Sequence, residues 1–272
     1  MLKPKVIAMD CDGTMVSDDK VLTPMMRQAL IDLHNEGVLL IMASGRPADM
    51  CLKSIEDWQL GFEFDGVIGY NGAELYDNET KKTDEYYKLS KENLKEIVTL
   101  LSRFDKGNPF VLDENFKCLN SKYDDALEWA IRKGSTEQLV VKDISELWAR
   151  EQPKIHCRFA VPEDLDEVIS QIHLPEDCPY YCFRTQTTML EFTDKRTNKG
   201  FALKEYCRRH NIDLSEAMAC GDTTNDNGMI EVAGMGVCLL NGSDDTKEKA
   251  NYITEEDVDN NGLAKFFYKY VI

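Results

Sequence analysis

Val6-Ile7-Ala8-Met9-Asp10-Cys11-Asp12-Gly13-Thr14 is the stretch that decides the fold of this chain. Its four leading apolar residues predict a short strand that is buried on both faces of a parallel sheet. Alternate side chains of an extended backbone leave the same face, so Asp10 and Asp12 begin side by side. Two neighbouring carboxylates repel each other unless a cation or a shared proton lies between them. Gly13 and Thr14 then add a tight turn and a hydroxyl, which suit a loop that holds phosphate.

The segments that follow this strand alternate between strands and helices. Apolar runs predict strands at 38–43 and 66–70, and helical patterns lie at 23–36 and 48–58. The same alternation returns near the C-terminus, with helices expected at 198–210, 224–232, 244–250 and 262–270 and strands at 217–221, 236–240 and 252–254. This order predicts an α/β fold, in which a Rossmann-like, doubly wound parallel sheet carries helices on both faces.

A region of different character separates these two parts of the chain. Short strands at 73–76 and 86–89 around a polar turn predict a hairpin. Beyond it, helices are expected at 91–104, 123–133 and 162–172, and strands at 139–141, 155–160, 180–185 and 189–192. This mixture predicts an α+β domain at 84–192, inserted into a core domain that residues 1–83 and 193–272 form together.

Composition limits the partners of the protein. Its 272 residues are 43% hydrophobic and carry a formal net charge of −17, so we expect neither nucleic acid nor an anionic membrane surface as a partner. An anionic substrate therefore needs a local positive site. The nine cysteines form no CxxC pair, and no apolar run has the length of a membrane helix. We expect reduced thiols in a cytoplasmic protein, whose oligomeric state the sequence leaves open.

Polar residues follow the predicted strands, at the edge where an open parallel sheet binds its ligands. Asp10 and Asp12 end the first strand, Ser44 follows the second and Asn71 follows the third. The strand at 217–221 leads into Gly221-Asp222-Thr223-Thr224-Asn225-Asp226. Taken singly, each residue has an ordinary structural role as a helix cap or a turn residue. Their joint placement predicts one site.

The chemistry of these residues indicates a hard cation. Several acids and no histidine converge on the site, and all-oxygen ligands favour Mg²⁺. Lys199 is expected in the first turn of a helix, where the macrodipole disfavours a positive charge. A nearby carboxylate or phosphate would resolve that conflict. The alternative is an exposed lysine whose ammonium group reaches water.

These residues fall into four motifs that resemble those of the haloacid dehalogenase superfamily. The motifs are Asp10-Cys11-Asp12-Gly13-Thr14, Ser44-Gly45-Arg46, Lys199-Gly200 and Gly221-Asp222-Thr223-Thr224-Asn225-Asp226, in the family's order and spacing. The insertion after the third strand is similar to that of the Cof-type branch, which carries a type IIB cap. The resemblance covers essentially the whole chain. Its first and fourth motifs are highly specific, whereas the other two are weak by themselves.

The resemblance implies a phosphatase that works through an aspartyl-phosphate intermediate. Asp10 would be the nucleophile and Asp12 the acid and base. Ser44 would bind the transferring phosphoryl group, and Lys199 would neutralise the charge that builds up there. The implied Mg²⁺ ligands are Asp10, the backbone carbonyl of Asp12, and Asp222, with support from Asp226 and Asn225.

The remaining predicted contacts concern the substrate, which is expected to be a small phosphorylated metabolite, namely a sugar phosphate. Residues of the core motifs and of the third strand end are expected to bind the phosphate or the substrate; they are Gly13, Thr14, Gly45, Arg46, Asn71 and Asn225. The inserted domain is expected to act as a cap that reads the leaving group. Within it, Arg158 and Arg184 are candidates for gripping the substrate, although such arginines are more often surface or ion-pair residues.

Two other functions stay open on the sequence. A phosphohexomutase would use the same first motif to move phosphate between two hydroxyls, without releasing free phosphate. A binding module would sense phosphorylated metabolites without turnover, although it would not need Asp12 as a proton donor. The sequence does not identify the physiological substrate.

Overall fold

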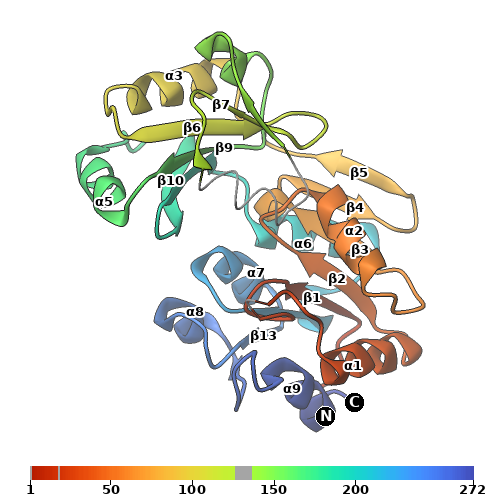
Figure 1. The fold of residues 1–272 in the computed structure, drawn as a ribbon. Coiled ribbons are helices and arrows are strands. Elements are labelled where there is room, and N and C mark those ends of the chain that lie inside the picture. The colour runs from red at the N-terminus through yellow and green to blue at the C-terminus, as the bar shows by residue number, and fades with distance from the viewer. Residues whose placement is uncertain (1, 18, 126–136) are drawn as a thin grey trace. The chain divides into compact units, whose positions relative to one another are not determined.

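The computed structural model describes residues 2–17, 19–125 and 137–272. The chain forms two compact units (Figure 1). The first unit comprises Met1–Tyr86 and Arg196–Ile272, and the second comprises Tyr87–Lys195. The first unit is thus assembled from both ends of the chain, with the second inserted between them.

The first unit contains an eight-stranded sheet. Its strands are β1 (Val6–Asp10), β2 (Leu39–Ala43), β3 (Gly66–Gly69), β4 (Glu74–Asp77), β5 (Lys82–Glu85), β12 (Ala217–Gly221), β13 (Met235–Cys238) and β14 (Tyr252–Ile253). They lie in the order β14-β13-β12-β1-β2-β3-β4-β5. The strands from β14 to β3 pair in parallel, whereas β4 and β5 pair antiparallel. The carboxyl ends of β12, β1 and β2 therefore lie side by side.

Helices cover both faces of this sheet. One face packs against α1 (Pro24–Asn35), α2 (Ala48–Asp57) and α9 (Gly262–Tyr270), and the other against α6 (Lys199–Arg209) and α7 (Asn227–Val232). Alternation along β1 explains the two layers, because Ile7 belongs to the first core and Val6 to the second. A strand buried on both faces is continuously apolar. The predicted α/β fold with a doubly wound core is confirmed.

The remaining short elements of the first unit are helical. They are the 3₁₀ turns η1 (Tyr70–Gly72), η3 (Leu214–Glu216) and η4 (Thr224–Asp226), and the helix α8 (Asp244–Lys249). The turn η1 follows β3 directly and η4 begins three residues after the end of β12, and both carry residues of the predicted site. The helix expected over 224–232 is therefore divided into η4 and α7.

The second unit contains a six-stranded sheet, and the helices among its described residues lie on one face. Its strands are β6 (Gly107–Leu112), β7 (Cys118–Asn120), β8 (Gln138–Val140), β9 (Lys154–Phe159), β10 (Tyr180–Gln186) and β11 (Met189–Asp194), in the order β10-β11-β9-β6-β7-β8. The helices α3 (Lys91–Leu101) and α5 (Pro162–Gln171) and the 3₁₀ turn η2 (Ile144–Trp148) pack with it around one apolar core.

The structure corrects the sequence prediction in two places. The hairpin pairs β4 with β5 at Lys82–Glu85, so the strand predicted at 86–89 is wrong. All four residues of β5 are exposed and three are charged, so this strand lacks an apolar signal. The strands β6 and β7 are not predicted from the sequence. The residues Gly-Asn-Pro at the start of β6 are typical of a turn, which explains why the pattern does not indicate this strand. The helix predicted at 123–133 lies outside the described residues from position 126 onward.

Two further findings concern membrane-spanning helices and the state of the cysteines. Within the described ranges, no helix combines the length and the apolar character that crossing a bilayer requires. All nine cysteines are free thiols, and eight of them are buried. They contribute to the cores as small apolar groups.

Replacing Gly72 by alanine is expected to destabilise the protein more than replacing Gly61. Both glycines have a positive φ, of +106° and +86° respectively, so alanine is strained at either position. At Gly72 a Cβ would also lie 2.2 Å from the backbone oxygen of Asn198, whereas nothing lies within 4 Å at Gly61. We expect losses of about 3 kcal/mol for Gly72→Ala and about 1 kcal/mol for Gly61→Ala in urea denaturation. Equal losses would contradict the close approach of these two segments.

Candidate active site

The predicted site residues meet where the central strands end. Asp10 is the last residue of β1, Ser44 follows β2 and Asp222 follows β12. Because β12, β1 and β2 are parallel neighbours, these three residues lie at one edge of the sheet. Asn71 lies in η1, directly after β3. The strand-end rule thus places all four residues along the same edge.

A buried cluster of three carboxylates forms the centre of this edge. Asp10, Asp222 and Asp226 each offer one oxygen, and these oxygens lie within 4.8 Å of one another. Lys199 is fully buried among them. Its Nζ donates to Oδ1 of Asp10 at 2.5 Å and to Oδ1 of Asp226 at 2.6 Å. The alternative of an exposed lysine is therefore wrong, and the carboxylates resolve the conflict with the helix dipole.

The pKa shifts of these groups show how the cluster distributes its charge. Burial, followed by the charges of Asp226 and Asp222, raises the pKa of Asp10 well above its ordinary value, against the effect of Lys199. Burial and Asp226 raise the pKa of Asp222 to about 6. Burial alone would lower the pKa of Lys199, but Asp10 and Asp226 outweigh it and raise that pKa. One lysine cannot neutralise three carboxylates, so the cluster favours a further cation.

Asp226 shapes the loop that carries Asp222. Its Oδ2 accepts hydrogen bonds from the backbone N–H groups of Asp222 at 2.9 Å and Thr223 at 3.0 Å. Its other oxygen accepts from Lys199. Both oxygens of Asp226 are thus engaged by the protein, while Asp10 and Asp222 keep more capacity for an additional ligand.

The turn after β1 packs closely on Asp222. Thr14 donates its hydroxyl to Oδ1 of Asp222 at 2.9 Å. Gly13 has a φ of +87°, and a Cβ there would lie 2.5 Å from Oδ2 of Asp222. A glycine is therefore required for this turn to approach the carboxylate. The turn is also held by Asn241, whose Nδ2 donates to the backbone oxygen of Gly13 at 2.9 Å.

The side chain of Asp12 stands apart from the three clustered carboxylates. Arg46 contacts both of its oxygens, at 2.7 and 2.6 Å, and Lys20 lies 2.9 Å from Oδ1. Burial tends to raise the pKa of Asp12, but Arg46 and Lys20 outweigh it and lower that pKa. Asp12 is thus ionised near neutral pH. The structure also places Arg46 on Asp12, within the first unit.

Four further predicted residues form a second group beside the cluster. The backbone N–H of Asn71 donates to the backbone oxygen of Ser44 at 2.9 Å, and Asn225 donates to Oδ1 of Asn71 at 3.2 Å. A Cβ on Gly45 would lie 3.3 Å from that same oxygen. Ser44 accepts a hydrogen bond from the N–H of Arg46 at 3.2 Å. Ser44, Gly45, Asn71 and Asn225 are therefore brought together.

The two arginines predicted in the cap both have partners within the second unit. Arg184 forms an ion pair with Asp166 on α5, so it points to the helix-covered face of the sheet. Arg158 donates to the hydroxyl of Thr188 at 3.0 Å and lies 3.4 Å from Asp124. These two residues thus lie on opposite faces of that sheet.

Two residues at the site were not predicted. Lys20, which contacts Asp12, lies in a loop and belongs to no motif. Asn241, which holds the Gly13 turn, follows the end of β13 closely. The strand-end rule could have identified Asn241, because β13 is parallel to β12 and ends at the same edge. Nothing in the local sequence marks Lys20.

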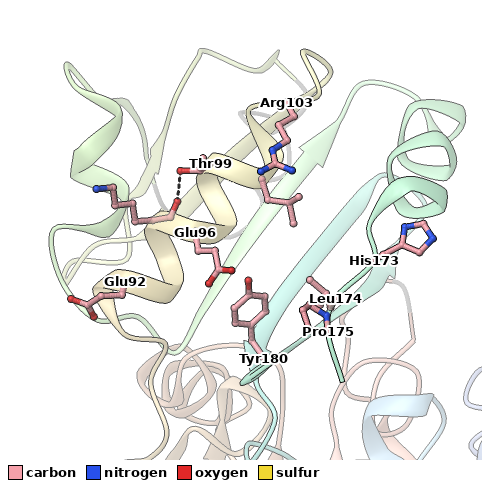
Figure 2. A pocket seen from close by; sticks show the side chains of 10 residues that line it. Glu92, Glu96, Thr99, Arg103, His173, Leu174, Pro175 and Tyr180 are labelled. Carbon is pink, nitrogen blue, oxygen red and sulfur yellow. Dashed lines mark hydrogen bonds between the residues drawn. The ribbon is translucent and has the colours of Figure 1, made fainter. Parts of the chain in front are cut away.

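A separate cavity lies within the second unit (Figure 2). It has a volume of about 430 Å³, and α3 supplies one wall and residues 173–180 the other. Its lining residues include Glu96, Arg103, His173 and Tyr180. None of the predicted site residues borders it, so this cavity is distinct from the carboxylate cluster.

Lys199→Met is expected to lower the free energy of unfolding by about 3–5 kcal/mol, because it leaves buried carboxylates without their cation. Lys204→Met is the matched control, since Lys204 lies on the same helix but is exposed, and its effect should stay within about 0.5 kcal/mol. Guanidinium denaturation without added metal measures both. Adding Asp226→Asn to Lys199→Met should recover part of the loss. Similar values for the two lysine variants would contradict the buried ion pairs.

A divalent cation is expected to stabilise the protein more at about pH 7.5 than at about pH 5. The fold raises the pKa of Asp222 from 3.8 to about 6. Protonation of Asp222 therefore stabilises the cation-free fold, fully below pH 3.8, and this stabilisation is lost as the pH rises through 6. Mg²⁺ would bind the ionised carboxylates and offset that loss. Melting temperatures with and without Mg²⁺ test this, with Asp222→Asn as the variant that should lose the effect. An equal shift at both pH values would speak against it.

Comparison with known proteins places the chain in a family. Residues 7–267 match the haloacid dehalogenase-like hydrolases. The chain is 24% identical over 277 residues to the 5-amino-6-(5-phospho-D-ribitylamino)uracil phosphatase YcsE of Bacillus subtilis, covering 98% of this chain and 96% of the relative. It is 26% identical over 273 residues to the phosphoglycolate phosphatase of Methanobrevibacter smithii, covering 98% of both.

Solved structures share the fold. A haloacid dehalogenase-like hydrolase from Bacteroides thetaiotaomicron superposes with a TM-score of 0.84 at 23% identity, over 98% of this chain and 99% of that one. The HAD subclass IIB sugar phosphatase BT4131 gives a TM-score of 0.79 at 22% identity, over 97% and 98% of the two chains. The resemblance read from the four motifs is confirmed: because the family match spans nearly its whole length, this chain belongs to the haloacid dehalogenase-like hydrolases.

Proposed function

We propose that the protein is a Mg²⁺-dependent phosphatase that hydrolyses phosphate monoesters of small metabolites through an aspartyl-phosphate on Asp10. One observation carries the proposal: Asp10 lies at a strand end, 2.5 Å from a buried lysine and beside two further buried carboxylates. A carboxylate nucleophile needs positive charge around it to approach an anionic phosphoryl group. Lys199 supplies one such charge.

In the first step, an oxygen of Asp10 attacks phosphorus, and the bond between phosphorus and the ester oxygen breaks. The leaving oxygen keeps the bonding electrons and takes a proton from Asp12. Lys199, beside Asp10, stabilises the charge that develops on the phosphoryl group, and Ser44 holds the group by a hydrogen bond. The product of this step is the free alcohol and a phosphorylated Asp10.

In the second step, water attacks the phosphorylated Asp10. Asp12 accepts a proton from the water as the new phosphorus–oxygen bond forms and the bond to Asp10 breaks. Inorganic phosphate leaves, and Asp10 is restored. Arg46 and Lys20 hold Asp12 and lower its pKa, so before the first step Asp12 must leave these partners and take up a proton.

The residues present fit a magnesium ion. All donors in the cluster are oxygens, the three carboxylates lie within 4.8 Å, and Lys199 leaves part of their charge uncompensated. Asp10, Asp222 and the backbone carbonyl of Asp12 would hold the ion, with Asp226 and Asn225 in support. When bound, the ion neutralises charge on the phosphoryl oxygens.

The named substrates of two relatives bear on the alcohol part of the substrate. One relative is named for a ribityl phosphate substrate and another for phosphoglycolate, so the leaving group differs among relatives. We favour a sugar or polyol phosphate and assign recognition of the alcohol to the second unit, acting as a cap. Nine free cysteines fit a reducing compartment such as the cytoplasm.

Replacement of Asp10 and Asp12 separates the two steps. Asp10→Asn should abolish release of phosphate from every ester. Asp12→Asn should still release nitrophenol from p-nitrophenyl phosphate, in a burst of about one equivalent per active site, because this leaving group needs little acid help whereas the second step still needs the base. Rapid-quench kinetics with Mg²⁺ measures the burst.

The matched control is Asp19→Asn, an exposed carboxylate of the same loop that should keep normal turnover. Normal turnover in Asp10→Asn would show that the nucleophile is misassigned. Transfer of phosphate between hexose hydroxyls without free phosphate would instead favour the mutase.

A further inference from the structure

Two basic side chains converge on Asp12, outside the cluster of buried carboxylates. Arg46, in the loop after β2, contacts both oxygens of Asp12, at 2.7 and 2.6 Å. Lys20, in the loop after β1, has its Nζ 2.9 Å from Oδ1 of the same carboxylate. One negative charge thus faces two positive charges. This part of the strand edge therefore carries a local excess of positive charge, although the whole chain has a net charge of −17.

A tight turn fixes the backbone from which Lys20 reaches Asp12. Lys20 has a φ of +61°, a left-handed conformation that is uncommon for a residue other than glycine. Its N–H donates to the backbone oxygen of Ser17 at 3.0 Å. Asp19 accepts from the hydroxyl of Ser17 at 2.9 Å and from the N–H of Val21 at 3.0 Å, so this acid is engaged within the turn. Strained residues that their surroundings hold in place are often found at functional sites.

The pairs that Asp12 forms are open to solvent, unlike the buried pairs of Lys199. The side chains of Asp12, Arg46 and Lys20 are 37%, 34% and 51% exposed. Ion pairs with this exposure contribute little to stability, since water already solvates their charges. They therefore exchange partners at a small cost in free energy. An anionic group of a ligand can reach both cations and replace Asp12 as their partner.

The proposed role of Asp12 removes the shared partner of these two cations. In that role Asp12 turns to the leaving oxygen of the ester and lies within hydrogen-bond distance of it. Among the residues that the structure describes, no second carboxylate forms an ion pair with Arg46 or Lys20. Two positive charges that stay close together without an anion repel each other. The atoms next to the leaving oxygen would lie close to both cations, so the leaving group itself can supply the missing anion.

We infer that Arg46 and Lys20 select a leaving group that carries an anionic group of its own, a carboxylate or a second phosphate. This anion would replace Asp12 on both cations and free Asp12 for the leaving oxygen. Arg46 offers a planar fork that suits carboxylate and phosphate alike, and Lys20 adds a point charge. The inference rests on the proposed function, because it takes the leaving group to be the alcohol of a phosphate ester. It narrows the substrate to sugar or polyol phosphates that bear an acid group.

Two pairs of esters measure the effect of the added anion. In the first pair, 3-phosphoglycerate has a carboxylate where glycerol 3-phosphate has a hydroxymethyl group. In the second pair, fructose 1,6-bisphosphate has one phosphate more than fructose 6-phosphate. For the wild type, kcat/KM should be at least about tenfold higher for the more anionic member of at least one pair, as hydrogen bonds to charged groups permit. The pair that shows the preference distinguishes a carboxylate from a phosphate.

Substitutions of Lys20 test whether this residue causes the preference. Lys20→Gln keeps a long polar side chain without the charge, and it should lower the ratio of kcat/KM within the preferred pair at least about fivefold. Lys20→Arg keeps the charge and should retain most of the ratio. A general loss of activity does not affect a ratio within one pair. Lys53→Gln is the matched control, since Lys53 is an exposed lysine of the same unit, and it should leave the ratio unchanged.

Two kinetic results would overturn the inference. A wild type without a preference in either pair would show that the cations do not contact the leaving group. A preference that Lys20→Gln leaves unchanged would show that Lys20 acts only on Asp12.

A binding measurement separates this inference from the proposed function. If the wild type hydrolyses neither these esters nor p-nitrophenyl phosphate, the proposed function fails, and isothermal titration calorimetry with the two pairs decides whether the cations bind the added anion. Binding of the more anionic member that is at least about tenfold tighter with the wild type, but not with Lys20→Gln, would support the inference. Absence of binding, equal affinities within both pairs, or the same preference in both proteins would overturn it.

Discussion

The first unit depends on the buried ammonium group of Lys199. Removing a charge from water costs several kcal/mol, and only well-placed partners offset that cost. Here the partners are Asp10, at the end of β1, and Asp226, in the turn after β12. These ion pairs join segments from the two ends of the chain, which lie 189 and 27 residues from the lysine. The same contacts let three carboxylates remain buried at one strand edge, where the proposed function places a cation and a phosphoryl group.

The second unit also buries charged side chains. On the face of its sheet opposite the apolar core, Lys154 and His156 both contact Glu191 across neighbouring strands. This buried group keeps Glu191 ionised and His156 neutral. The three carboxylates of the first unit share the ammonium group of Lys199, whereas Glu191 contacts both Lys154 and His156, so the first unit's cluster is the one with negative charge left for a further cation.

Asp12 shows why motif roles need the surrounding structure. The family resemblance implies that Asp12 is a proton donor, and its position two residues after Asp10 predicts that the two side chains start out side by side. In the fold, Arg46 and Lys20 hold its side chain and lower its pKa. The proposed role of Asp12 therefore requires it to exchange these partners for the substrate, which the motif alone does not reveal.

The sequence by itself determined the doubly wound core, because strands buried on both faces are continuously apolar and alternate with helices. It also predicted that Asp10, Ser44, Lys199 and Asp222 belong to one site, since parallel strands end at a common edge. Hydrophobic pattern could not place the exposed strand β5, the partners of Asp12, or the contacts of Lys154 and His156 with Glu191. These depend on cross-strand register and on which side chains meet at long sequence separation. Only the tertiary structure decides such contacts, because pairing between distant strands leaves no local signal in the sequence.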